Sequence, residues 1–304
     1  MNIDDTKNMN KNTERFKKFA KLNCSPKPYN QSLEFTCFTS TMLYELQEKW
    51  NMRHPTKQIN FDDPYSIWEY FKTTFGEVCE NEMCWLQQEF AKSSLGKSFL
   101  HSFAPEQPYS WNNNPNEWLS NIDIHKAMKQ YETAHNDFLF IGPSPIDFDN
   151  ITSGKCVWED LCKFSLENML LRNKKKIGII FNLDNHDEPG SHWVSLYIDI
   201  YDRCIYYFDS TRVKVNEVPV EIQRFVNKVM LECKERYDEI LDFLVSDKII
   251  HQTKNSECGV YCLYFIISLL SGEKVWKDFL KTRISDEEIM KYRNIYFNKP
   301  ISKL

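Results

Sequence analysis

The sequence is poor in several features that whole classes of protein require. It contains only 8 glycines among 304 residues, which argues against a fold built on glycine-rich phosphate loops. The longest apolar run, near residues 262–270, is shorter than the ~20 residues that a helix needs to cross a bilayer, so we expect no membrane partner. The N-terminal segment MNIDDTKNMNKN lacks the apolar stretch of a secretory signal.

Charge and cysteine content argue against further classes. A net charge of −5 gives no general attraction to nucleic acid, and we expect no specific nucleic-acid partner. Ten cysteines without a secretory signal favour an intracellular, reducing environment with free thiols over a disulfide frame. Cys79 and Cys84 have too long a spacing for the usual zinc loop and no convincing second pair follows. We therefore expect neither a metal nor a cofactor.

Apolar residues, at 42%, are sufficient for a substantial core, and the N-terminal third has helical periodicity. Helices are expected after Thr39 or Ser40, from Asp63-Pro64, and over 84–90. The proline- and asparagine-rich segment 94–116 is typical of a linker. The sequence thus predicts a small helical accessory domain, residues 1–108, followed by a second domain, residues 109–304.

The second domain has a block of strand patterns surrounded by helix patterns, which predicts an α+β fold with a mostly antiparallel central sheet. Asn116 is expected to cap its first helix. The strands are expected at 138–141, 177–183, 192–200, 204–208 and 248–250, and the helices at 117–128, 158–171, 219–233, 258–270 and 285–292.

A cysteine at the start of a buried helix is the first candidate site residue. Cys258 follows the polar loop 252–257 and precedes an apolar segment that ends at Gly272. The first N–H groups of a helix carry partial positive charge, and a thiol placed there ionises more readily to the nucleophilic thiolate. Gly259 would leave room beside the sulfur for a substrate backbone. A cysteine that only fills the core is the alternative.

Two neighbouring strands bring a base and a carboxylate together. His192 opens one strand, and Asp209 lies 17 residues later, where the returning strand ends. A turn near Asp202 makes the strands antiparallel, so the two side chains come to face each other. The carboxylate can accept from one imidazole nitrogen and leave the other facing a thiol, as in a nucleophilic triad. A strand-edge histidine and a turn carboxylate without catalytic roles are the alternative.

Gln252 is the fourth candidate, six residues before Cys258. Its amide could reach an oxyanion that the Cys258 backbone N–H also binds, although an isolated loop glutamine is most often only solvated. The order of the four residues, with Trp193 after His192 and Gly-Val-Tyr261 after Cys258, resembles that of the SUMO-specific and adenovirus-type cysteine proteases.

Three further segments support this resemblance. Glu117-Trp-Leu-Ser-Asn121 is similar to that family's Trp-Leu-Asn-Asp motif, with Asn121 in place of the final aspartate. The segments 283–293 and 79–84 resemble the viral branch of the family, which processes polyproteins in African swine fever virus and other large DNA viruses. The family resemblance covers residues 115–297.

The resemblance implies roles for six residues. Trp118 and Trp193 would flank a narrow channel for a Gly-Gly stretch of substrate, where a Cβ would clash with an indole face; plain core packing is the alternative. In the reaction itself, Cys258 would be the nucleophile, His192 the general base, Asp209 the group that orients it, and Gln252 the oxyanion donor.

The implied function is that of a cysteine endopeptidase that cleaves after Gly-Gly-type sites. Its partner would be a polypeptide, most simply a viral structural polyprotein cut during virion maturation, in the virion and the host cytoplasm. Three alternatives stay open: a protease that deconjugates SUMO- or ubiquitin-like modifiers, an acetyltransferase that uses the same cysteine and histidine, and an inactive module that binds a ubiquitin-like tail. The N-terminal domain is expected to dock substrate or virion components, or to stabilise the fold.

Overall fold

The computed structural model describes residues 22–28 and 31–300, which form two compact units. One unit comprises residues 110–293. The other comprises the described residues up to Tyr109 together with residues 294–300, so the end of the chain returns to the N-terminal unit. Among the described residues, no helix combines the length and apolar character needed to cross a bilayer.

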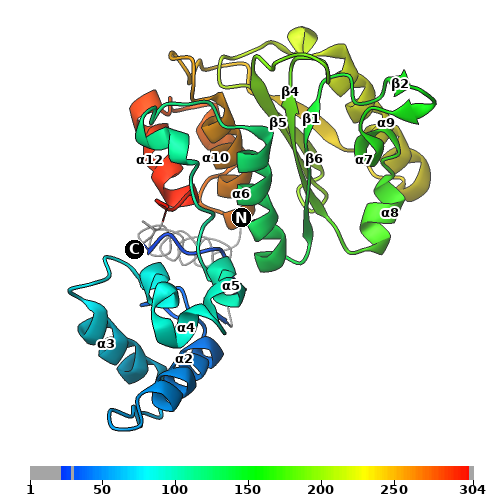
Figure 1. Cartoon of the computed structure of the whole chain (residues 1–304). Coiled ribbons are helices and arrows are strands. Elements are labelled where there is room, and N and C mark those ends of the chain that lie inside the picture. Colours follow the sequence, from blue (N-terminus) through cyan, green and yellow to red (C-terminus); the bar gives the residue numbers. More distant parts are fainter. Residues whose placement is uncertain (1–21, 29–30, 301–304) are drawn as a thin grey trace. The chain divides into compact units, whose positions relative to one another are not determined.

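A five-stranded sheet forms the centre of the unit 110–293 (Figure 1). Its order is β1-β4-β5-β6-β7, with antiparallel pairing among the three middle strands and parallel pairing of each edge strand. This arrangement confirms the α+β class. The strands are β1 (Phe138–Pro145), β4 (Lys176–Asn182), β5 (Trp193–Asp199), β6 (Cys204–Phe208) and β7 (Asp242–Val245).

Helices cover both faces of this sheet (Figure 1). On one face, α10 (Cys258–Ser271) packs on β5, and α6 (Asn121–Ala134) packs on β1 and on α10. On the other face, α9 (Val220–Tyr237) contributes its apolar stripe, Ile222, Phe225, Val226, Val229 and Cys233, to a core shared with the strands. The shorter elements are β2 (Ile151–Thr152), β3 (Lys155–Cys156), α7 (Glu159–Cys162), α8 (Leu166–Leu171), η5 (Val215–Glu217) and α11 (Trp276–Phe279).

The helix α10 is the most extensively buried helix of this unit. Most of its residues are apolar, and nearly all of its side chains are buried, because it lies between the sheet and other helices. Phe265 of α10 stacks on Phe208 of β6 with ring centroids 4.7 Å apart. The helix ends at Gly272, whose φ of +71° lies in the left-handed region that favours glycine. A buried helix therefore presents Cys258 at its first position.

The N-terminal unit is helical, as predicted. The helices that begin at Ser40 and Pro64 are capped by the side chains of Thr39 and Asp63, which accept from the backbone N–H groups of Met42 and Ser66. Trp50 is surrounded by aromatic rings, including that of Phe90 at 5.4 Å. The elements are α2 (Ser40–Arg53), α3 (Pro64–Phe75), η2 (Glu82–Gln87), α4 (Glu89–Lys92), α5 (Gly96–Phe99) and η3 (Leu100–Ser102); η4 (Tyr109–Asn112) and α12 (Asp286–Tyr296) span the two boundaries between units.

Several expected elements differ in the structure. The strand expected at 248–250 is wrong, because β7 at Asp242–Val245 pairs with β6 instead. The helix expected from residue 117 begins at Asn121, since Ser120 and Asp123 form a reciprocal capping box there. The helix expected over 158–171 is two helices, α7 and α8, with a break at residues 163–165.

The segment 94–116, expected to be a linker, is largely folded. It contains α5, η3 and η4, and the side chains of Phe99, Phe103 and Trp111 are buried. The proline and asparagine content indicated a loop, but the aromatic residues between them supply enough apolar surface to order the chain.

The expectation of free thiols is wrong for six cysteines. The structure contains disulfides between Cys24 and Cys37, Cys79 and Cys84, and Cys156 and Cys162. Each pair lies close in the chain, with separations of 13, 5 and 6 residues. The remaining four cysteines, Cys204, Cys233, Cys258 and Cys262, are free. The cysteine that begins α10 thus keeps its thiol.

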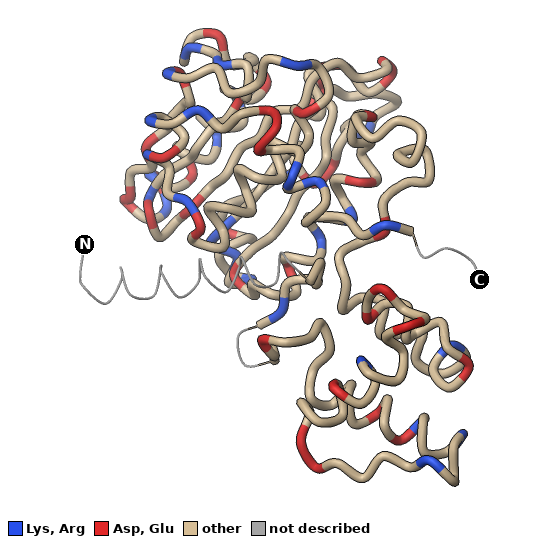
Figure 2. The backbone as a smooth tube through the Cα atoms, turned by 90° about the vertical axis from the view of Figure 1, so that its left-hand side faces the viewer, with Lys and Arg blue, Asp and Glu red and all other residues tan. Residues whose placement is uncertain are grey.

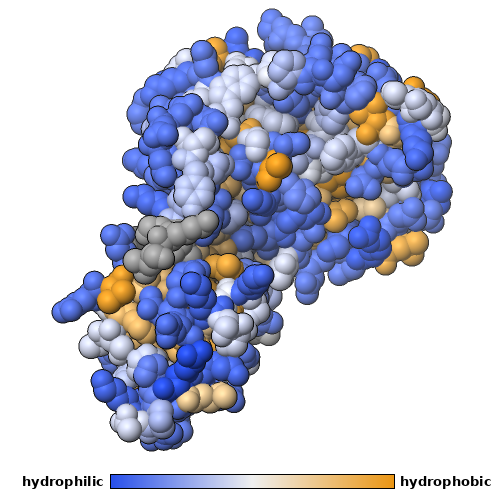
Figure 3. Space-filling model, viewed as in Figure 1, coloured by the Kyte–Doolittle hydropathy of each residue, from blue (hydrophilic) through white to orange (hydrophobic). Residues whose placement is uncertain are grey.

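The surface of the unit 110–293 is mixed in charge and hydropathy. Acidic and basic residues are interspersed along the chain in Figure 2. Apolar residues form small, separate patches in Figure 3, and exposed examples such as Ile151 and Leu171 come from different elements.

Candidate active site

Cys258 occupies the first position of α10 and is 1% exposed. The helical ladder begins with the bond from Tyr261 N to Glu257 O at 2.9 Å, so the N–H groups just before it have no partner within the helix. A Cβ added at Gly259 would lie 3.0 Å from the Leu119 Cβ. The space beside Cys258 that we expected a substrate to use is therefore filled by Leu119.

His192 and Asp209 are brought together by the antiparallel pairing of β5 and β6. The ring Nε2 lies 2.9 Å from Asp209 Oδ1. The same oxygen accepts from the backbone N–H and the Oγ1 of Thr211, at 2.8 and 2.7 Å. These contacts fix the carboxylate and leave Nδ1 of the histidine available on the other side of the ring.

The Cys258 side chain lies close enough to the His192 ring to raise its pKa. Burial lowers the pKa of His192, but hydrogen bonds with Asp209 and Cys258 and their negative charges outweigh burial and raise the pKa to about 10. Burial raises the pKa of Asp209, yet the bond and the charge of His192 hold it below the usual range. The histidine is therefore protonated and the carboxylate ionised at neutral pH. Thiol, imidazole and carboxylate lie in the order that nucleophilic catalysis requires.

Gln252 is held in a fixed orientation next to this group. Its Oε1 accepts from Ser210 Oγ at 2.6 Å, and its backbone N–H donates to Ser210 O at 2.9 Å. One hydrogen of Nε2 donates to Lys254 O at 2.7 Å. A primary amide carries two such hydrogens, so a second donor remains at this nitrogen.

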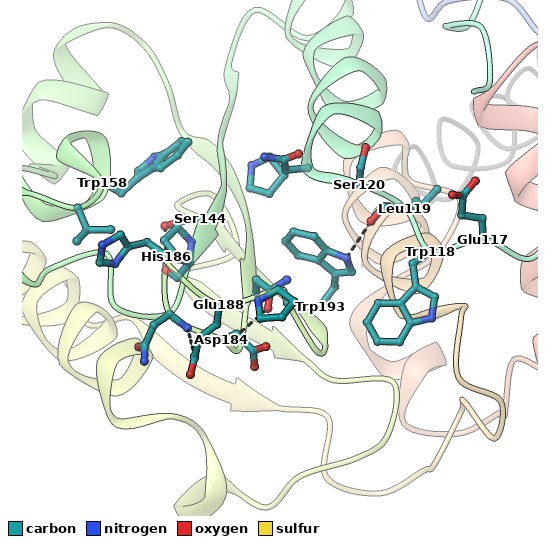
Figure 4. A pocket seen from close by; sticks show the side chains of 18 residues that line it. Glu117, Trp118, Leu119, Ser120, Ser144, Trp158, Asp184, His186, Glu188 and Trp193 are labelled. Carbon is teal, nitrogen blue, oxygen red and sulfur yellow. Dashed lines mark hydrogen bonds between the residues drawn. The ribbon is translucent and has the colours of Figure 1, made fainter. Parts of the chain in front are cut away.

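The two tryptophans occupy different environments. Trp193 is 7% exposed, and its Nε1 donates to Leu119 O at 3.1 Å. Trp118 is 41% exposed. Both line a pocket of about 600 Å³ (Figure 4). Trp193 therefore combines the packing role considered above with a place in the pocket wall, whereas Trp118 is free to contact a ligand.

Several residues that support the site were given no role in the sequence analysis. Ser210 and Thr211 hold Gln252 and Asp209, and Leu119 joins Trp193 to the start of α10. Arg293, although 3% exposed, donates to the backbone carbonyl of Glu117, and its guanidinium lies 3.6 Å from the Trp111 ring centroid. Leu119 and Arg293 lie in the segments 117–121 and 283–293 that carry the family resemblance, and Ser210 and Thr211 directly follow Asp209, but no sequence pattern indicated these contacts.

Asn121, the position at which the chain departs from the Trp-Leu-Asn-Asp motif, is the first residue of α6. Its side-chain oxygen accepts from the Ile122 N–H at 2.9 Å. The capping function falls to Ser120 and Asp123. In the part of the chain that the structure describes, no group of three or more His, Cys, Asp or Glu side chains is arranged to hold a metal.

Comparison with known proteins identifies the family. The profile of the Ulp1 protease family, C-terminal catalytic domain, matches residues 159–303, which include Cys258 and His192. A protein of Acanthamoeba polyphaga mimivirus whose name describes it as a thiol protease is 30% identical, over 92% of this chain and 94% of its own length. The chain belongs to the Ulp1 protease family. It is a thiol protease, as its named relatives are.

Proteins of African swine fever virus extend the likeness beyond the catalytic part. A cysteine protease of African swine fever virus is 25% identical over 74% of this chain and 85% of its own length. The crystal structure of an African swine fever virus protease covers 91% of this chain and 96% of its own, with a TM-score of 0.63 and 19% identity. That structure shares the fold over both units.

Proposed function

We propose that this Ulp1-family protease cleaves the peptide bond after a Gly-Gly sequence, with Cys258 as nucleophile. The observation that carries the assignment is the contact chain from Cys258 to His192 to Asp209, located at the start of a buried helix. His192 serves as base and acid. Asp209 orients the imidazole and stabilises its protonated form, and Gln252 donates a hydrogen bond to the oxyanion.

In the first half of the reaction, the Cys258 sulfur attacks the carbonyl carbon of the glycine before the scissile bond. His192 carries the thiol proton during the attack, and its bond with Asp209 stabilises the imidazolium. The resulting oxyanion accepts from the Cys258 backbone N–H and from the second amide hydrogen of Gln252. Loss of one such donor typically costs ~2.7–4 kcal/mol of transition-state stabilisation.

In the second half, the tetrahedral intermediate collapses and the carbon–nitrogen bond breaks. His192 gives its proton to the leaving amine, which departs with a free N-terminus. A water molecule then attacks the thioester and passes a proton to His192, and the acid product leaves Cys258 as the sulfur regains its starting state.

The preference for Gly-Gly is supported by the two tryptophans. Trp193 is fixed by its bond to Leu119, and the exposed indole of Trp118 lies on the same pocket. A substrate chain that passes between two indoles must be thin, and glycine removes the Cβ that would contact them.

The substrate class follows from the relatives. Both relatives described above are viral, and we infer that the natural substrate is a viral structural polyprotein cut during virion maturation, in the virion and the host cytoplasm. One related African swine fever virus protein bears the name SUMO-1 cysteine protease, which favours deconjugation of a SUMO-like modifier as the second candidate.

The decisive experiment maps new protein N-termini in infected or transfected cells that express the parental enzyme or Cys258→Ala. Termini that follow Gly-Gly should appear with the parental enzyme alone. Release of a modifier without new internal termini would favour the deconjugase, and Gly-Gly cleavage that persists in Cys258→Ala would refute the assignment of the nucleophile.

A further inference from the structure

The pocket beside the candidate active site extends well beyond the two tryptophans proposed to hold Gly-Gly. It includes Trp118 and Trp193 but neither Cys258 nor His192. In Figure 4, Trp118 lies at one end, Trp193 in the middle, and Trp158 and His186 at the other end. If Gly-Gly runs from Cys258 past the tryptophans, the far end of the pocket receives the residues that precede Gly-Gly.

The apolar part of the far end is held in place by its surroundings. Val157 and Trp158 line the pocket, and their N–H groups donate to Asn150 O and Phe148 O at 2.9 and 3.0 Å. Both residues lie within the segment closed by the disulfide between Cys156 and Cys162. An aromatic and aliphatic wall is thus preformed.

The charged residues of the pocket are mostly acidic. Glu117, Asp184 and Glu188 line it, and among its lining residues, all within the described chain, none is Lys or Arg. The one basic group is His186, and its Nδ1 is paired with the buried Asp147 Oδ2 at 2.6 Å. The pocket therefore carries net negative charge.

We propose that this pocket binds a lysine or arginine side chain of the substrate, located a few residues before Gly-Gly. The inference rests on the proposed Gly-Gly cleavage and adds a second specificity determinant to it. The methylene stem packs against Val157 and the Trp158 ring, as long basic side chains do on apolar surfaces. The cationic head reaches the carboxylates of Asp184 and Glu188.

Hydrogen bonds within the loop between β4 and β5 orient these carboxylates and leave some of their acceptor positions unoccupied. Asp184 accepts from Ser191 Oγ, and Glu188 Oε2 accepts from the Asn185 N–H at 2.8 Å. Each carboxylate offers about four acceptor positions, so both can accept from a guanidinium or ammonium as well. Trp158 adds a ring face for a cation–π contact.

The test compares peptides that share Gly-Gly-Ala and carry Arg, Gln or Glu, in turn, at each of several positions before Gly-Gly and after the cut. The parental enzyme should prefer Arg over Gln by about tenfold in kcat/KM at one upstream position, and salt should weaken the preference. In Asp184→Asn/Glu188→Gln, which keeps both loop acceptors, the preference should fall to about twofold. Glu188→Lys should shift it toward Glu.

Asp187→Asn is the matched control, because Asp187 belongs to the same loop but does not line the pocket. It should keep the parental preference. Equal cleavage of the Arg and Gln peptides at every position, a preference only after the cut, or a preference that survives the double substitution would overturn the inference while Gly-Gly cleavage stands. Failure to cleave any Gly-Gly peptide would refute the proposed function together with it.

Discussion

Replacing Asp209 by Asn tests the proposed chemistry at its most constrained contact. The substitution keeps the shape of the side chain and removes the charge 2.9 Å from His192 Nε2. A hydrogen bond to a charged group contributes about 1.5–3 kcal/mol, and a pair of charges 4 Å apart about 4 kcal/mol at an effective dielectric constant of 20. Since about 1.4 kcal/mol corresponds to one pKa unit, the pKa of His192 should fall by about 1–3.

The direction of the effect on activity follows from the ionised pair. Catalysis needs protonated His192 beside the Cys258 thiolate, so activity is lost as rising pH removes the imidazolium proton. The pKa of His192 is raised to about 10 in the parental enzyme, which places that loss far into the alkaline range. In Asp209→Asn the loss should begin about 1–3 pH units lower, with kcat/KM reduced by about 10²–10⁴-fold at neutral pH.

The assay is kcat/KM for a Gly-Gly-Ala peptide across neutral and alkaline pH, together with the rate at which iodoacetamide alkylates Cys258. Thr211→Val is the control, because it removes the Oγ1 donor to Asp209 at 2.7 Å but leaves the carboxylate charge and the backbone donor. It should shift the alkaline limb of the pH profile of kcat/KM less than Asp209→Asn does. An Asp209→Asn enzyme with an unmoved alkaline limb and nearly parental activity would show that the carboxylate does not hold the imidazolium.

Three further predictions concern the surroundings of the pair. Gly259→Ala places a Cβ 3.0 Å from the Leu119 Cβ and should reduce the free energy of unfolding by about 1–3 kcal/mol, measured by denaturant titration; an unchanged free energy of unfolding would contradict the packing argument. Ser210→Ala removes the donor to Gln252 Oε1 and should lower kcat by roughly tenfold with little change in KM in steady-state kinetics, whereas an equal change in both would point to a binding role. The pKa of His192 is raised from 6.5 in the unfolded chain to about 10, so the protonated histidine adds to the free energy of unfolding. That contribution is complete below about pH 6.5 and is lost as the pH rises toward about 10. Urea unfolding should show the loss in the parental protein and not in His192→Gln.

The four candidate catalytic residues could be found from sequence because each is tied to a local pattern. The alternating strand that follows His192 and the short return to Asp209 set an antiparallel register, and the structure has that register. The apolar segment after Cys258 and Gly272 at its end predict both ends of α10, as observed. Their catalytic roles remain predictions until the variants are assayed.

Local sequence patterns could not predict the pocket or the disulfides. Trp158 and Asp184 lie 26 residues apart and line one pocket. The chain after β1 connects them, because Trp158 N–H donates to Phe148 O and Ile146 N–H donates to Asp184 O. The disulfides could not be predicted because composition indicates an environment and does not say which sulfur atoms come within bonding distance.

The sequence by itself determined the elements whose signals are local: the polar-to-apolar transition at Cys258, the strand alternation after His192, and the stripe along α9. Tertiary structure decided where those elements stop and what they meet. The edge strand forms at Asp242–Val245, since pairing with β6 outweighs the weak local preference for a strand at 248–250. The contact of Leu119 with Gly259 likewise joins residues 140 positions apart, and only a folded chain brings such residues within van der Waals distance.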